Sequence, residues 1–125
     1  MKLKENHKRI LQDCLHDYVG LWDLIKDVYP EIQVRFPLPN WVLNSTLEEV
    51  REMLNTGLFL IGSHNPENKG EEFIPFTMSI DEIAMLIERE WKSKENTNNN
   101  LYIGYFCWFQ ASPTGKEIAQ ELGLI

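Results

Sequence analysis

The side chains that most often do chemistry in proteins are few and scattered in this chain. Its three histidines, His7, His16 and His64, fall in three separate segments. Zinc sites need clustered cysteine and histidine ligands, and no second cysteine or histidine pair completes such a set. Cys14 and His16 are only two positions apart, which places them on different sides of a helix. We therefore expect no metal site.

The two cysteines, Cys14 and Cys107, stand alone among apolar neighbours. A nucleophilic cysteine needs a base beside it, and the sequence offers only His16 or His64 as a candidate base for Cys107. Buried free thiols are typical of cysteines in such apolar settings. The pattern predicts two unpaired, inert thiols rather than a disulfide or a catalytic residue.

The dipeptide Gly115-Lys116 suggests a phosphate-binding loop, but the surrounding residues exclude one. That motif requires a glycine five positions before Gly115 and a hydroxyl residue after the lysine. This chain has Gln110 and Glu117 at those positions. We therefore expect no enzymatic activity, no catalytic residue and no cofactor.

The composition is that of one compact, acidic domain. The chain has 125 residues, of which 43% are apolar and 25% charged, and its net charge is −7. This length suits a single domain, and this balance is typical of globular proteins. No apolar run approaches the roughly 20 residues of a membrane helix, and no secretory signal pattern is present. We therefore expect a cytoplasmic protein that contacts no membrane.

Hydrophobic periodicity places two helices in the first quarter of the chain. From Ile10 to Tyr29, apolar residues recur every three or four positions, which is the spacing of one helical face. Gly20 weakens the helix in the middle, and Asp17 offers a carboxylate that can cap a new one. The pattern predicts helices over 4–16 and 18–29, and one bent helix fits the same spacing.

Two capping boxes predict where further helices begin. Thr46 with Glu49, and Ser79 with Glu82, each combine a hydroxyl residue with a glutamate three positions later. In such a box each side chain binds the other residue's backbone amide. Gly57 is the expected left-handed stop of the first of these helices.

The other capping, proline and turn residues predict where the remaining elements lie. Ser112 before Pro113 predicts a last helix that buries Ile118, Ala119 and Leu122. The sequence predicts three further strands, over 58–61, 73–77 and 102–109, and a helix over 79–92. The segments between the elements are a proline-rich connection over 31–45, an exposed hairpin tip over 63–72 and a linker over 96–100. Pro75 indicates that strand 73–77 lies at a sheet edge.

Two segments resemble winged-helix domains. Thr46 to Phe59, TLEEVREMLNTGLF, is similar to their third helix and first wing strand, and Trp108 to Glu117, WFQASPTGKE, is similar to an aromatic strand that leads into a terminal helix. The resemblance covers 8–62 and 102–122. It implies an α+β, winged-helix-like single domain over 1–125, with about five helices and a small antiparallel sheet of two to three strands. The chain departs from that pattern in the stretch 31–45 and in the inserted helix 79–92.

A second resemblance carries no activity with it. The stretch Asp17 to Trp22, DYVGLW, is similar to one in small uncharacterised bacterial proteins. It indicates a bacterial type of sequence without implying a ligand or a reaction.

In winged-helix regulators the third helix enters the major groove of DNA. The corresponding helix here carries carboxylates, which oppose contact with phosphate groups. The sequence therefore predicts a small, acidic, non-enzymatic protein-interaction domain, for example a bacterial immunity protein that neutralises a basic toxin. The candidate partner-binding residues are Glu48, Glu49, Glu52, Glu71 and Glu72. The alternative is a winged-helix DNA-binding transcription regulator, in the form of a homodimer, that uses the basic arm 2–9 and the hairpin tip.

Overall fold

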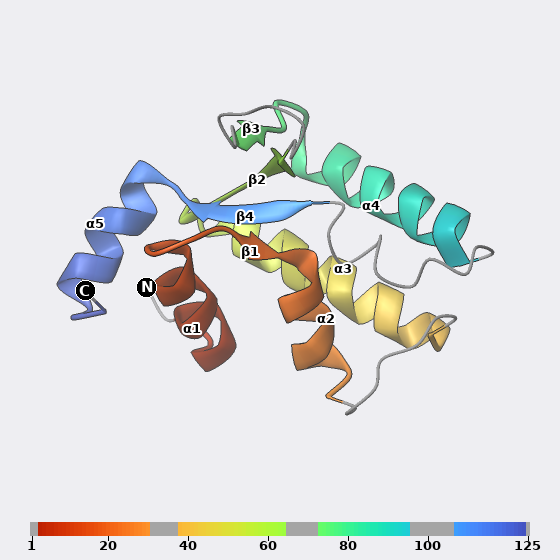
Figure 1. Cartoon of the computed structure of the whole chain (residues 1–125), viewed down its shortest axis with the longest axis horizontal. Helices are drawn as coiled ribbons and strands as arrows, with labels where there is room; N and C mark the ends of the chain where they lie inside the picture. Colours follow the sequence, from red (N-terminus) through yellow and green to blue (C-terminus); the bar gives the residue numbers. More distant parts are fainter. Residues whose placement is uncertain (1–2, 31–37, 65–72, 96–106, 125) are drawn as a thin grey trace.

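The computed structural model describes residues 3–30, 38–64, 73–95 and 107–124 (Figure 1). Within these ranges the chain forms five helices and a four-stranded antiparallel sheet, so the α+β class is confirmed, with one strand more than expected. In chain order the elements are α1 (Glu5–Cys14), β1 (Val19–Gly20), α2 (Leu21–Val28), α3 (Asn40–Asn55), β2 (Phe59–His64), β3 (Phe73–Pro75), α4 (Ile80–Glu95), β4 (Trp108–Ala111) and α5 (Pro113–Glu121).

The sheet has the strand order β1-β4-β2-β3. β4, the last strand in the sequence, therefore lies between β1 and β2 in the sheet. Its residue Phe109 pairs with Val19 on one side and with Ile61 on the other. β3 lies at the edge, where Pro75 pairs with Gly62. The edge position predicted from Pro75 is confirmed, because proline has no amide hydrogen to give to a further strand.

The first three helices lie on one side of the sheet, and α4 packs along α3 (Figure 1). α5 returns beside α1, where Gln12 Nε2 donates to the carbonyl oxygen of Leu124. In the ranges described, no helix is long and apolar enough to cross a membrane.

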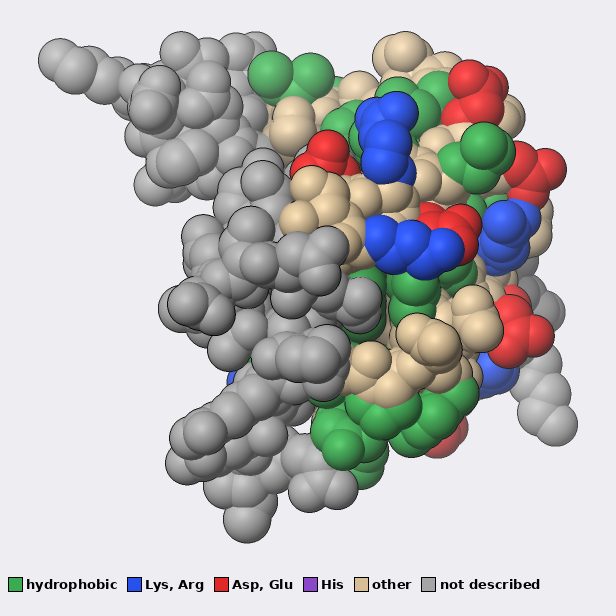
Figure 2. Space-filling model, turned by 90° about the vertical axis from the view of Figure 1, so that its right-hand side faces the viewer, with side chains coloured by type: hydrophobic (Ala, Val, Ile, Leu, Met, Phe, Trp, Pro, Cys, Tyr) green, Lys and Arg blue, Asp and Glu red, His purple; other side chains and the backbone are tan. Residues whose placement is uncertain are grey.

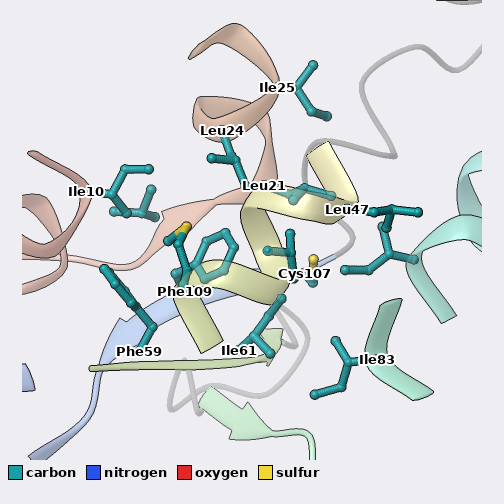
Figure 3. Packing of buried hydrophobic residues seen from close by; sticks show 14 of the residues in the cluster. Ile10, Leu21, Leu24, Ile25, Leu47, Phe59, Ile61, Ile83, Cys107 and Phe109 are labelled. Carbon is teal, nitrogen blue, oxygen red and sulfur yellow. The ribbon is translucent and has the colours of Figure 1, made fainter. Parts of the chain in front are cut away.

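One continuous hydrophobic cluster joins these layers. Phe109 is fully buried at its centre, and side chains from helices and strands converge around it (Figure 3). The ring of Phe59 meets it edge to face, with the ring centroids 6.4 Å apart. Trp91 of α4 is also fully buried. Burying each such side chain stabilises the fold by about 1.5–3 kcal/mol relative to leaving it exposed.

Three of the predicted helix boundaries are confirmed by their hydrogen bonds. Ser79 Oγ accepts from the amide of Glu82 at 3.2 Å, and the Glu82 carboxylate accepts from the Ser79 amide at 3.4 Å, which is the expected capping box. Ser112 Oγ accepts from the amide of Gly115 at 2.9 Å. Gly57 follows α3 with a φ of 74°, the left-handed conformation expected of a stop.

The predicted start of α3 at Thr46 is wrong. The helix begins at Asn40, six residues earlier, and Thr46 is fully buried within it. The extra turns form because Val42 and Leu43 are buried in the core, and that burial outweighs the local capping signal. Glu49, the expected partner of Thr46 in the capping box, instead contacts α1.

The predicted start of the second helix at Tyr18 is also wrong. The Asp17 carboxylate does accept from the amide of Tyr18, at 2.7 Å, but the helix α2 begins only at Leu21. Val19 and Gly20 form β1 instead, because they pair with β4. The Leu21 amide extends this contact by donating to the carbonyl oxygen of Cys107 at 3.1 Å.

The C-terminal segment differs in two details. β4 is described from Trp108 onward and ends at Ala111, two residues beyond the predicted end at 109, and its residues alternate between half-buried and buried. Leu122, expected to be buried, is 46% exposed. Gly123, with a φ of 72°, turns the chain so that Leu124 packs against the core instead. The expected tip over 63–72 begins two residues too early, because Ser63 and His64 belong to β2. The rest of it, 65–72, lies outside the described residues, as do the linker 96–100 and residues 31–37 and 101–106.

Thr46 generates a stability prediction. Its buried Oγ1 has no hydrogen-bond partner among the described residues, and burying an unpaired hydroxyl is unfavourable. We expect Thr46→Val to raise the free energy of unfolding by about 1 kcal/mol, measured by urea denaturation. The same change at the exposed Thr77 is the control and should have no effect. A destabilised Thr46→Val protein would mean that the hydroxyl is hydrogen-bonded.

Candidate functional site

The helix α3 buries one face in the core and exposes the opposite one as a stripe. The exposed residues recur at intervals of three or four and therefore share one face. We call this face the α3 stripe; it consists of Trp41, Asn44, Glu48, Glu52 and Asn55. It contains two of the five predicted partner-binding glutamates.

A cluster of charged side chains connects the stripe to α1. His7 of α1 is only 2% exposed, and its Nε2 atom lies 2.5 Å from Glu49 Oε2. A carboxylate accepts but does not donate, so the ring nitrogen is the donor. Lys4 Nζ lies 3.3 Å from Glu49 Oε1 and 2.7 Å from Glu52 Oε2. These contacts raise the pKa of Lys4, with the hydrogen bond to Glu52 as the largest cause.

The cluster separates the roles of the predicted glutamates. Glu49 has a side chain that is only 20% exposed, and it supports the buried ring of His7. Glu52 is half exposed and pairs with Lys4. Glu48 is exposed and forms no ion pair with any described residue. Glu71 and Glu72 lie outside the described residues, as does the side chain of His64.

This cluster is also where the described residues could hold a metal ion. Ligand atoms of His7, Glu49 and Glu52 all lie within 4.8 Å of one another. The ammonium group of Lys4 already contacts both carboxylates, so a divalent cation would have to displace it. The arrangement therefore acts as an ion-pair network between α1 and α3.

Spacing along the chain could not reveal this contact. His7 and Glu49 are 42 positions apart, and the glutamate had an alternative use in a capping box. One signal was present, because His7 shares the spacing of the buried residues Ile10 and Cys14 on α1. That spacing places the ring on the buried face of the helix.

The helix α4 borders the stripe on its other side. Arg51 of α3 pairs with Asp81 of α4, and Lys92 Nζ lies 3.0 Å from Glu88 Oε1. A hollow of about 250 Å³ separates the two helices near the start of α3, and it is lined by Asn40, Leu43, Asn44, Glu88 and Lys92. Figure 2 faces this end of the molecule and shows charged side chains of both signs above a group of hydrophobic ones.

Trp41 lies at the N-terminal end of the stripe. The residue is 51% exposed, and its ring centroid lies 5.7 Å from that of Tyr29, which directly follows α2. The indole therefore contacts the ring of Tyr29 while about half of Trp41 stays exposed to solvent. Large aromatic side chains in such positions are frequent anchors of protein interfaces.

The expectation of two buried free cysteines is confirmed. Cys14 lines a pocket of about 290 Å³ with His16 and Lys116 at its border. Burial raises the pKa of the Cys14 thiol to about 12, and nearby Asp13 and Asp23 add to this effect. Complete burial also raises the pKa of Cys107. Both thiols therefore stay protonated at neutral pH, which does not suit a nucleophile.

The contact between His7 and Glu49 generates a prediction about stability. Glu49→Ala removes the partner of a buried ring nitrogen and should lower the free energy of unfolding by about 2 kcal/mol. Glu52→Ala breaks a half-exposed pair, so its effect should stay below about 1 kcal/mol. Glu48→Ala is the matched control on the same helix, with an expected change within about 0.5 kcal/mol. Equal losses for all three variants in urea denaturation would contradict this assignment.

The thiols generate a prediction about pH. Because the folded protein holds the Cys14 proton up to about pH 12 and the unfolded chain releases it near pH 8.5, stability should fall as the pH rises between these values. At pH 8, Ellman's reagent should label neither cysteine until urea unfolds the protein. Rapid labelling of the folded chain would contradict the inferred burial.

No family model, no curated protein and no solved structure matches this chain.

Proposed function

We propose that this protein is a non-enzymatic interaction domain that binds a basic protein through the α3 stripe. The observation that carries the proposal is the combination on one helix face of an exposed indole at Trp41 with an exposed carboxylate at Glu48 that pairs with none of the described residues. The indole offers apolar contact area, and the carboxylate favours a cationic partner.

The surroundings of the stripe support this proposal. The hollow beside Asn44 gives a partner side chain a place to enter. Two ion pairs along α4 give the border a polar rim, as is typical of interfaces. The net charge of −7 also favours encounter with a basic protein, since long-range attraction raises association rates.

A bacterial immunity protein that neutralises a basic toxin is the concrete form of this proposal. Such a protein needs a pre-formed acidic surface and no catalytic group. The alternative, a winged-helix DNA-binding regulator, needs α3 to offer cations to phosphate groups. Arg51 of α3 is engaged with Asp81, and the exposed residues Glu48 and Glu52 are acidic. The charges of α3 thus favour a protein partner.

The test is affinity purification from the organism that encodes the protein, with the full chain immobilised. The wild type should retain a protein of high isoelectric point. Trp41→Ala and Glu48→Lys should each weaken its binding, measured by surface plasmon resonance. The association rate of the wild type should fall as the ionic strength rises. The association rate of Glu48→Lys should fall less steeply, because this variant lacks one charge that attracts the partner. Co-expression should then rescue cells that produce the captured protein, if it is a toxin.

Glu117→Lys provides the matched control, because it makes the same charge change at an exposed position on α5. It should bind the partner nearly as the wild type does. Equal losses for Glu48→Lys and Glu117→Lys would contradict a specific role of the α3 stripe. Retention of duplex DNA with a steep salt dependence, in place of a basic protein, would favour the transcription regulator.

A further inference from the structure

A second exposed surface lies on the outer face of α4. It surrounds a groove of about 370 Å³ lined by Met78, Glu82, Met85, Leu86 and Arg89. Met85 is 65% exposed, and Met78, just before the helix, is also exposed. The buried face of α4, formed by residues such as Ile83 and Trp91, packs into the core and takes no part in this surface. We call it the α4 groove.

The charges of the groove are arranged symmetrically about its apolar centre. Glu82 lies three positions before Met85, and Arg89 lies three positions after Leu86. Residues at these intervals share one side of a helix, so the acid, the apolar pair and the base form one row. Arg89 is exposed and forms no ion pair with the described side chains. One Glu82 carboxylate oxygen serves the cap with Ser79.

This order is self-complementary for two antiparallel helices. If a second α4 lies across the first with the two-fold axis between Met85 and Leu86, each Glu82 faces the Arg89 of the other copy. Each Met85 then lies opposite the Leu86 of the other copy at the centre, where its flexible side chain can pack. A two-fold interface uses the same patch on both partners, so one row supplies both halves of each charge pair.

We propose that two copies of this chain associate through the α4 groove, with α4 antiparallel to its counterpart. The charge complementarity of Glu82 and Arg89 selects a second copy as the occupant. An antiparallel copy of α4 places an arginine opposite each glutamate, whereas an unrelated protein would match this order of charges only by chance. The association buries exposed methionine surface, which supplies the driving force, and the two charge pairs set the direction. The proposal is independent of the α3 stripe.

The test is the oligomeric state of the full chain, measured by sedimentation equilibrium over a range of concentrations. The wild type should form dimers. Arg89→Glu and Glu82→Arg should each raise the dimer dissociation constant at least about tenfold, because each places like charges opposite one another twice. The double variant with both changes should dimerise nearly as the wild type does. An equimolar mixture of the two single variants should associate more tightly than either alone.

Matched controls separate association from folding. Lys116→Glu makes the same charge change as Arg89→Glu on α5 and should leave the dimer unchanged. Ser79→Ala removes the capping hydrogen bonds but keeps the charge of Glu82, so it should also leave the dimer intact. Circular dichroism verifies that each variant is folded. A wild type that stays monomeric at the highest concentration would overturn the proposal, and so would a dimer that Arg89→Glu does not weaken.

Discussion

The position of β4 between two earlier strands is the constraint on which the rest of the fold depends. Phe109 pairs through its backbone with Val19 and with Ile61, and its ring is fully buried against Phe59. The N-terminal helices and the β2–β3 hairpin are therefore held together by a segment near the end of the chain. Contacts so distant in sequence form only when the whole core assembles, which favours cooperative folding.

This arrangement also decides which part of α3 can meet a partner. The helix packs against α2 and α4, with β2 following it. Glu49 and Lys4 then attach α1 along its flank. One stripe remains open, and its residues are held on a rigid element rather than on a loop. Rigidity lowers the entropy lost on binding, so the burial of α3 that stabilises the fold also prepares its exposed face for recognition.

Local signals in the sequence predicted the features that local chemistry determines. Ser79 and Ser112 cap helices as expected, because a hydroxyl near the first amides acts within one turn. Thr46 and Asp17 carry similar signals, yet both predicted starts are wrong, because burial of Val42 and pairing of Val19 with β4 come from distant parts of the chain. The same limit applies to the candidate site. Acidic residues of α3 were visible in the sequence, whereas the role of Glu49 depends on a histidine 42 positions away.

The two proposed surfaces have different residues, and ion pairs on α4 lie next to both. On α4, Asp81 and Glu88 belong to ion pairs beside the α3 stripe, whereas Met85 and Arg89 border the groove. The ion pairs thus lie between the two surfaces along α4. A dimer would then present two stripes. If the basic partner is itself dimeric, binding at both stripes would strengthen the complex without any additional contact within each site, because the second attachment is intramolecular.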